Sequence, residues 1–568
     1  MQKLKNIAAE LVSQAASELF APAALSSDDV RAMLEYPPDG AMGDLALPCF
    51  KLSKSLRRSP MEIASRLAEK ISDPAFASTE AVGGYLNFKK DASAFAARVS
   101  NTVLALGDTY GAPKMGEGKT VVLDYSSPNV AKPFHIGHLG TTVIGHSLKL
   151  LHEFAGYTCV GINHLGDWGT QFGKLIVAYK KWGDREEIEK GEIDALVALY
   201  VRFHAEAEKD ESLNDEARAM FARLEQHDEE CMALWRWFIE ISLREYNKTY
   251  RMLGITFDSY NGESFYTDKM PAEIEKIRKA GILEIDDGAS VVNLEKWNMP
   301  PCLILKRDGS TLYPTRDIAA AVYRKNTYDF EKCIYVTSAG QCLHFAQWFK
   351  VLELMGYDWY RGLVHVPYGT VSIGGEKLAT RTGNVILLKD LFAQAIEKVK
   401  GIMKEKNTTA GDDVAEKVGV GAIIFYYLSN NRMRDINFVM EDALSFDGNT
   451  GPYAQYTYAR TCSLLEKAGD AGKQVALLPV TEEEAELSRV LALFPETVES
   501  ALAEYEPSVI TRYILDLCAA FNRFYHECQI LSCEDAAVRE NRLAFTRAVK
   551  TVLGKALSLI CMPTPEKI

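Results

Sequence analysis

Residues 120–138, TVVLDYSSPNVAKPFHIGH, decide the fold of this chain. They begin with the β-branched and apolar run Thr120–Leu123, which is typical of a central parallel strand. Apolar residues then recur at helical spacing from Leu139 to Phe154, Gly156 can end that helix, and Thr158–Ile162 has the pattern of a second strand. The pattern predicts a βαβ unit, the building block of a doubly wound α/β sheet.

Two histidines stand where the first predicted strand passes into the helix. His135 and His138 fall at the helix N-terminus, where free backbone N–H groups and the helix dipole favour a phosphate. Gly137 lets a ligand approach the backbone, and the imidazoles can donate hydrogen bonds to a phosphorus centre as charge builds up. The alternatives are a metal-binding pair and a purely structural pair. The chain has no Cys-x-x-Cys spacing, which argues against a cysteine-rich zinc site.

Composition indicates a globular protein of three or four domains. The chain has 568 residues, of which 47% are hydrophobic and 25% charged. Its eleven cysteines show no paired spacing, so we expect a reducing cytoplasm. The longest apolar run, Val418–Leu428, is too short to span a bilayer, and the N-terminus lacks a secretory segment. We therefore expect no membrane partner.

Net charge does not decide whether the partner is a nucleic acid. The total of −13 argues against one, but residues 181–230 hold 16 acidic and 7 basic side chains. This stretch alone carries −9 of the total, so a basic groove can exist elsewhere.

A second βαβ unit is predicted further along the chain. Strand Cys333–Val336 precedes a helix that passes through Trp348 and ends at Gly356, and strand Leu363–Val366 follows. Helical patterns dominate after residue 390. The expected parts are a small leading α+β domain (1–112), an α/β domain (113–390) with an acidic helical insertion (about 181–300), a helical connecting region (391–448) and an all-α domain (449–568).

Five segments resemble the signatures of one enzyme family. SSPNVAKPFHIGHL, residues 126–139, resembles the first signature of class I aminoacyl-tRNA synthetases in the form found in arginyl-tRNA synthetases. Four further segments match in order: NHLGDWGTQFG (163–173), DGSTLYPTRDIA (308–319), KLATRTGN (377–384) and NTGPYAQY (449–456).

The resemblance implies a Rossmann-type catalytic domain that activates arginine with ATP. An arginyl-adenylate would then pass to the 2′-hydroxyl of the terminal adenosine of tRNA(Arg). Mg²⁺ would accompany ATP, held by phosphates and water, without a dedicated protein ligand. The N-terminal domain would contact the tRNA elbow, and the C-terminal domain would read the anticodon. A monomer is expected.

Catalysis and ATP binding are assigned by the same resemblance. Class I enzymes have a second signature, K-M-S-K-S, and residues 377–381 of this chain, KLATR, correspond to it. Lys377 retains the first lysine of this signature, whereas Thr380 replaces the second. Many arginyl enzymes carry a lysine before the first signature instead, and Lys132 has that position, so Lys132 and Lys377 form a split pair on the β- and γ-phosphates. The catalytic residues are then His135, His138, Lys132 and Lys377, and the ATP-binding set is His135, Gly137, His138, Lys377, Thr380 and Arg381.

Arginine recognition needs carboxylates in the plane of a guanidinium. The resemblance assigns this task to Asp124, Ser127, Asn129, Tyr313, Asp317 and Gln341, with Asp124 and Asp317 as the carboxylates. Each residue type also has a simpler explanation: Asp124 could be a turn aspartate, Asp317 a helix N-cap, Tyr313 a core residue and Gln341 the first residue of a helix.

Other residues are candidates for contacts to the adenylate or to RNA. His164, Asp167, Trp168 and Gln171 follow the second strand and are expected near the adenylate or the acceptor end, although Trp168 could simply pack. Lys51, Lys54 and Arg58 are expected on one face of a helix that ends before Pro60, as an RNA contact or a solvated face. Tyr453, Tyr456 and Arg460 share a helical face that suits stacking on unpaired bases, or form a buried stripe.

Two positions depart from the family pattern. Gly140 stands where these enzymes usually have an arginine, and Ala379 replaces the usual serine of the second signature. The departures leave two other functions open. One is an H-x-G-H nucleotidyltransferase, and the other is an inactive synthetase paralogue that binds RNA or regulates.

Overall fold

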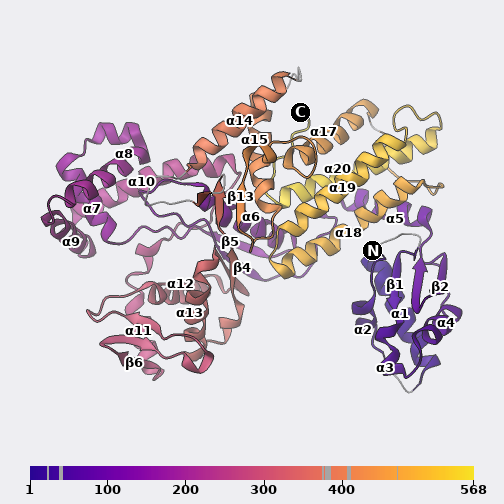
Figure 1. Ribbon diagram of the computed structural model, residues 1–568, viewed down its shortest axis with the longest axis horizontal. Helices are drawn as coiled ribbons and strands as arrows, with labels where there is room; N and C mark the ends of the chain where they lie inside the picture. Colours follow the sequence, from indigo (N-terminus) through magenta and orange to yellow (C-terminus); the bar gives the residue numbers. More distant parts are fainter. Residues whose placement is uncertain (22–24, 38–41, 374–375, 378–385, 406–410, 470) are drawn as a thin grey trace.

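A four-stranded parallel sheet lies near the centre of the computed structural model (Figure 1), which describes residues 1–21, 25–37, 42–373, 376–377, 386–405, 411–469 and 471–568. The strand order is β10-β9-β4-β5, and all neighbours are parallel. The strands are β4 (Thr120–Asp124), β5 (Thr158–Ile162), β9 (Lys332–Ser338) and β10 (Leu363–Tyr368).

Both predicted βαβ units are present. Helix α6 (Leu139–Phe154) joins β4 to β5, and α13 (Cys342–Leu354) joins β9 to β10. Alternate residues of β4 point into two different cores: Val121 and Leu123 lie in one cluster and Val122 in the other. Burial on both faces explains why this strand is an unbroken apolar run, and the predicted doubly wound fold is confirmed.

The region between β5 and β9, which includes the predicted helical insertion, holds a small sheet as well as helices. It has α7 (Thr170–Trp182), α8 (Arg185–Ala207), α9 (Ser212–Glu225), α10 (Glu229–Met252) and α11 (Met270–Lys279), and then an antiparallel sheet of β6 (Leu283–Asp286), β7 (Ala289–Val292) and β8 (Cys302–Leu305). The prediction missed a hairpin signal. Asp287 and Gly288 both have positive φ, as a two-residue β-turn requires.

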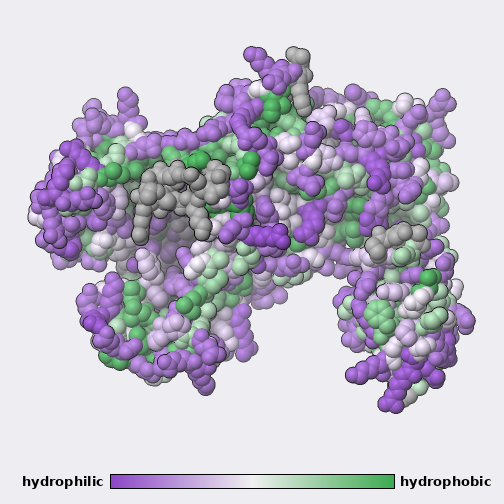
Figure 2. All heavy atoms as spheres, in the orientation of Figure 1, coloured by the Kyte–Doolittle hydropathy of each residue, from purple (hydrophilic) through white to green (hydrophobic). Residues whose placement is uncertain are grey.

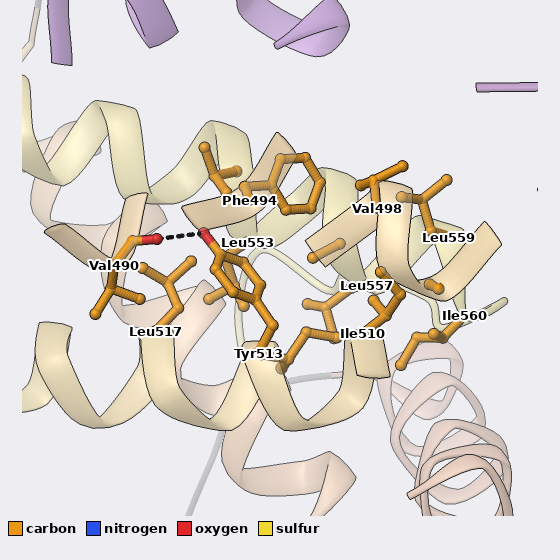
Figure 3. Close-up of a cluster of buried hydrophobic side chains, with 14 of the residues drawn as sticks. Val490, Phe494, Val498, Ile510, Tyr513, Leu517, Leu553, Leu557, Leu559 and Ile560 are labelled. Carbon is orange, nitrogen blue, oxygen red and sulfur yellow. Dashed lines mark hydrogen bonds between the residues drawn. The ribbon is translucent and has the colours of Figure 1, made fainter. Parts of the chain in front are cut away.

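Long helices form the C-terminal part, beside a small sheet. They are α14 (Leu388–Glu405), α15 (Asp412–Leu428), α17 (Gly451–Ala468), α18 (Glu482–Glu504), α19 (Ser508–Glu527) and α20 (Ala536–Leu559); the sheet has β11 (Val371–Ile373), β12 (Glu376–Lys377) and β13 (Ile436–Phe438). Figure 3 shows Phe494, Ile510 and Leu553 meeting in the apolar core of this bundle. The Tyr513 hydroxyl donates to the Val490 carbonyl there, 3.1 Å away, which satisfies a buried polar group.

The N-terminal domain packs a three-stranded antiparallel sheet against helices. It has α1 (Gln2–Leu19), α2 (Ser27–Met33) and α4 (Pro60–Lys70) around β1 (Leu45–Pro48), β2 (Ser78–Val82) and β3 (Tyr85–Lys89). The next helix, α5 (Ala92–Leu106), packs instead on α18 and α20 of the C-terminal bundle. The N-terminal domain reaches this bundle through α18, where the Tyr36 hydroxyl bonds the Glu496 carboxylate at 2.6 and 2.7 Å.

The prediction that one helix carries Lys51, Lys54 and Arg58 on the same face is wrong. A 3-10 turn covers Cys49–Lys51, and a one-turn helix α3 (Ser53–Leu56) follows. Arg57 has a left-handed backbone (φ 52°), which ends that helix before Arg58. The three cations therefore share an exposed segment but no helix face.

Hydrophilic residues cover most of the face shown in Figure 2, including the acidic helices of the insertion. This agrees with a solvated role for the acidic stretch. Among the described residues, no helix is both long and apolar enough to cross a membrane.

Candidate functional site

The two histidines of the first signature hold each other in place at the start of α6. His135 caps a 3-10 turn over Ile136–His138, and its Nδ1 accepts a hydrogen bond from the Gly137 N–H at 3.1 Å. The His135 N–H in turn donates to Nδ1 of His138 at 3.2 Å. Since Nδ1 accepts in both rings, a neutral ring carries its proton on Nε2, where it can donate to a ligand.

Burial keeps both rings uncharged. It lowers the pKa of His138 to about 3 and also lowers the pKa of His135. The pair can therefore stabilise a phosphate by donating hydrogen bonds, but it does not supply a proton at neutral pH.

The turn before this pair is strained. Ser126, Ser127 and Ala131 all have positive φ (71°, 47° and 58°), a conformation that is costly for residues with a side chain. Ser127 is the centre of its bonding: its hydroxyl donates to Oδ1 of Asp124 at 2.9 Å and accepts from the His164 N–H at 3.1 Å. The Ser127 hydroxyl therefore connects Asp124, at the end of β4, to His164, just after β5.

The chain after the second signature pairs with the first. The Ile136 N–H donates to the Ile386 carbonyl at 3.1 Å, and the Leu388 N–H donates to the Phe134 carbonyl at 2.9 Å. Lys377 lies in β12, but its side chain, Thr380 and Arg381 are outside the described residues. The backbone thus places the two signatures next to each other.

A cavity of about 530 Å³ opens at the carboxyl ends of β4, β9 and β10. This is the edge where a doubly wound sheet binds ligands. All six residues assigned to arginine line it, together with His138 and His164: Asp124, Ser127, Asn129, Tyr313, Asp317 and Gln341. Gly166 also lines it, and a side chain at this position would collide with Asn129, because a Cβ would lie 2.2 Å from the Asn129 amide oxygen.

Asp124 is already paired inside the protein. Its Oδ2 lies 2.8 Å from Nη2 of Arg324, and its Oδ1 accepts from Ser127. Arg324 is 1% exposed and faces the rings of Tyr266 and Tyr335. Burial alone would lower the pKa of Arg324, but the Asp124 carboxylate, together with smaller contributions from neighbours such as Tyr266 and Tyr335, outweighs it and the pKa is raised. Both oxygens of Asp124 are therefore engaged without any substrate.

Asp317 is not a helix N-cap, because α12 (Tyr313–Tyr328) begins one turn earlier. Its Oδ2 accepts from Nε2 of His344 at 2.6 Å. Tyr313, at the first position of the same helix, is 67% exposed and so is not a core residue. Gln341 directly precedes α13, close to the helix start that was its alternative explanation. Its side chain makes no capping hydrogen bond, however, and it lines the cavity.

Sequence reasoning missed four charged or titratable residues of this region: Glu263, Arg316, Arg324 and His344. Nη1 of Arg316 pairs with the Glu263 carboxylate at 2.8 Å, and burial raises the pKa of Glu263 to about 7. Arg316 adjoins Asp317 in the matched motif and could have been noticed. Glu263 lies in the insertion, and no pattern in the sequence marks it.

Three of the four adenylate or acceptor-end candidates point elsewhere. Asp167 is buried and accepts from the N–H and hydroxyl of Ser264 at 2.8 and 2.6 Å. Trp168 packs edge-on against Phe221 and Trp235. Gln171 lines a separate small pocket with Lys132, whose side chain is exposed. His164 alone lines the main cavity, and burial lowers its pKa.

The space beside Gly140 is filled by another side chain. A Cβ at Gly140 would lie 2.2 Å from the Tyr427 hydroxyl and 3.1 Å from a ring carbon of Tyr368. Tyr427 belongs to α15, and Tyr368 lines the cavity. A residue larger than glycine at position 140 therefore conflicts with this tyrosine pair.

The candidate RNA contacts lie on two surfaces. In the N-terminal domain, Lys51, Lys54 and Arg58 are exposed, although Lys51 pairs with Glu35 and Arg58 with Glu62. In α17, Tyr456 is 44% exposed, so the three residues there are not a buried stripe. The Arg460 guanidinium lies over Tyr456 and Tyr525 (5.1 and 4.7 Å), and the Tyr453 hydroxyl accepts from Asn522.

Known proteins match this chain over its whole length. Three family descriptions match: "Arginyl tRNA synthetase N terminal domain" over residues 6–89, "tRNA synthetases class I (R), catalytic domain" over 99–440 and "DALR anticodon binding domain" over 454–568. An arginine–tRNA ligase of Alkaliphilus metalliredigens is 50% identical over 541 residues, 94% of this chain and 95% of the relative. One of Clostridium botulinum is 48% identical over 567 residues, 99% of this chain and 100% of the relative.

A solved structure supports the same conclusion at the level of the fold. The arginyl-tRNA synthetase of Thermus thermophilus superimposes with a TM-score of 0.84 at 24% identity and covers 100% of both chains. Because the catalytic family matches more than half of the chain and curated relatives reach 48–50% identity over nearly all of it, the chain belongs to the arginine–tRNA ligases of class I.

Proposed function

We propose that L-arginine binds in the 530 Å³ cavity and that the α-phosphate of ATP binds at His135, Gly137 and His138. The arginine carboxylate attacks the α-phosphate, which forms arginyl-adenylate and releases pyrophosphate. The 2′-hydroxyl of the terminal adenosine of tRNA(Arg) then attacks the carbonyl and releases AMP. The observation that carries this proposal is that His138, a neutral donor of the phosphate turn, lines the same cavity as the six arginine candidates.

The ion pairs around the cavity indicate which carboxylate binds the substrate guanidinium. Arg324 already matches Asp124, and Arg316 already matches Glu263. Asp317 instead bonds a histidine, so its charge remains available to a cationic ligand. We assign the guanidinium to Asp317 with Tyr313 beside it, and we assign Asp124 with Ser127 to the wall of the cavity.

Pyrophosphate departure needs cations near the β- and γ-phosphates. Lys132, which precedes the phosphate turn, and Lys377, in the second signature, are proposed for this role, with Thr380 and Arg381 as further ATP contacts. Mg²⁺ would enter with ATP, coordinated by phosphate oxygens and water.

RNA binding is proposed at three places. His164 faces the adenylate or the terminal adenosine, whereas Asp167, Trp168 and Gln171 follow it in the chain without lining the cavity. Lys51, Lys54 and Arg58 would contact the tRNA elbow, where Phe50 and Tyr85 add exposed rings 5.7 Å apart. Tyr453, Tyr456 and Arg460 would contact anticodon bases, since stacked rings and a guanidinium suit unpaired bases.

We also propose a cytoplasmic monomer. The eleven cysteines are unpaired, which suits a reducing compartment. Light scattering after size-exclusion chromatography tests the oligomeric state.

Exchange of pyrophosphate into ATP tests the proposed reaction. It should depend on arginine, when all twenty amino acids are tried with and without tRNA(Arg), and tRNA charging should follow. Exchange without any amino acid would support a nucleotidyltransferase, and tRNA binding without exchange would support an inactive paralogue. Either result would overturn the proposal.

A further inference from the structure

Three carboxylates, Asp124, Glu263 and Asp317, line the cavity, and each is paired with one basic side chain of the protein. For Asp124 and Glu263 the partner is an arginine, which always carries a charge. For Asp317 the partner is His344, and a histidine can donate a hydrogen bond while it is uncharged. Only Asp317 therefore has a partner that can orient it without cancelling its charge.

His344 comes from a different helix than Asp317. It lies near the start of α13, three residues after Gln341, and it lines the cavity. Its ring stands edge-on to Phe345 at 5.5 Å, and Phe345 stacks on His365 at 4.3 Å. These contacts hold the imidazole so that Nε2 reaches Oδ2 of Asp317 at 2.6 Å.

The other oxygen of Asp317 is open. Among the residues that the structure describes, none donates a hydrogen bond to Oδ1, and Asp317 lines the cavity. A terminal carboxylate torsion is broad and roughly two-fold, so an unheld Asp317 could rotate away from any ligand. A fixed donor on Oδ2 removes that freedom.

We propose that His344 is the positioning residue for arginine recognition. Its Nε2–H holds Oδ2 and sets the carboxylate plane, so that Oδ1 faces the substrate guanidinium. This inference rests on the proposed function, because it assumes that Asp317 binds the guanidinium. It adds a specificity element that acts through Asp317 and need not touch the reacting atoms.

Two substitutions separate this bond from simple packing. In His344→Gln the amide nitrogen falls near the position of Nε2, whereas in His344→Asn it falls near Nδ1 and cannot reach Asp317. His344→Asn should raise the KM for arginine about 10-fold or more, as loss of a bond to a charged group does. His344→Gln should raise it clearly less. In both variants the KM for ATP, kcat and Tm should change little.

A double-mutant cycle with Asp317→Asn supplies the decisive readout. If His344 acts through Asp317, His344→Asn should add little to the arginine KM of Asp317→Asn. Full additivity, equal effects of Gln and Asn, or an unchanged KM in His344→Asn would each overturn the inference. Calorimetric titration of wild-type protein with arginine separates the two levels: no arginine binding overturns the proposed function as well, whereas normal binding with those outcomes overturns the role of His344 alone.

Discussion

Nη2 of Arg324 lies 2.8 Å from Oδ2 of Asp124 beneath the cavity, so the protein places a guanidinium of its own against one of the two aspartates expected to bind arginine. Two nitrogens of Arg324, Nε and Nη1, have no partner among the described residues. The Asp124 carboxylate is thus the main compensation for a buried charge. Asp124 and Asp317 line the same cavity but should respond differently to neutralisation.

Asp317→Asn should raise the KM for arginine roughly 10- to 100-fold, because a charge-assisted hydrogen bond is worth about 1.5–3 kcal/mol. Asp124→Asn should instead lower the free energy of unfolding by about 3–5 kcal/mol, since Arg324 loses its compensating charge. Steady-state exchange kinetics and denaturant titration measure the two effects.

The amino acid specificity of the wild-type enzyme is the companion test. Lysine should be a poor substrate because an ammonium does not fill a planar site, and citrulline should fail because it is uncharged. If Asp317→Asn kept the wild-type arginine KM, or if another amino acid were activated better, the assignment of this cavity to arginine would be wrong.

Replacing His135 or His138 by alanine should lower the adenylation rate roughly 10²-fold or more, with a smaller effect on arginine binding. His135→Asn is the matched control for folding: its side-chain oxygen can still accept from the Gly137 N–H, but the Nε2 donor is gone. Pre-steady-state adenylation should therefore fall in this variant while Tm stays close to wild type. Near-normal rates in all three variants would contradict the role of the pair.

Lys132→Ala should strongly reduce activation if Lys132 and Lys377 share the pyrophosphate charge. Adding Thr380→Lys should then recover part of the loss, because it restores the second lysine of the signature. Single-turnover pyrophosphate exchange measures both. A fully active Lys132→Ala enzyme would refute the split pair, and Lys190→Ala, at an exposed lysine with no proposed role, serves as a general control for lost surface charge.

Strong local patterns in the sequence predicted the central elements, but weaker local signals such as the Asp287-Gly288 turn were missed, and so were the contacts that long-range packing creates. Strands β4 and β9 and the turn at His135 follow from apolar runs and helix spacing, and all were confirmed. The positive φ of Ser126 is invisible in the sequence, because serine does not demand that conformation.

The partners of the aspartates were missed for a related reason. Asp124 and Arg324 lie 200 positions apart along the chain, and only the packing of α12 against β4 brings them together. Resemblance identified the aspartates as residues of the site. It could not show that one is already neutralised, which changes the role that we assign to it.

Acid should weaken folding through buried histidines. Burial lowers the pKa of His152 to about 4, and its side chain is 1% exposed. Below pH ~6.5 the imidazole binds a proton in the unfolded protein but not in the folded protein. The free energy of unfolding therefore decreases as the pH falls, and the decrease levels off near pH 4. The loss from this residue between pH 7 and pH 5 is about 2 kcal/mol. Urea titrations should show a flatter pH dependence for His152→Gln, but not for the exposed control His526→Gln.

Gly140→Ala tests whether the tyrosine pair has taken the place of the family's arginine. The new Cβ would lie 2.2 Å from the Tyr427 hydroxyl and 2.8 Å from its ring carbon Cζ, so we expect a loss of about 1–3 kcal/mol from overpacking. Gly401→Ala in α14 is the matched control: nothing lies within 4 Å of its Cβ, and helix propensity alone should add up to about 1 kcal/mol.

Shortening the opposing side chain should reverse the effect. Tyr427→Leu removes the ring that fills the space, so the double variant Gly140→Ala, Tyr427→Leu should be more stable than the sum of the single changes predicts. Gly140→Arg should fold and activate arginine only in the Tyr427→Leu background, because Tyr427 occupies the room that an arginine needs. Tm and pyrophosphate exchange across the cycle measure this coupling. If Gly140→Arg is tolerated with Tyr427 intact, the tyrosine does not fill that place.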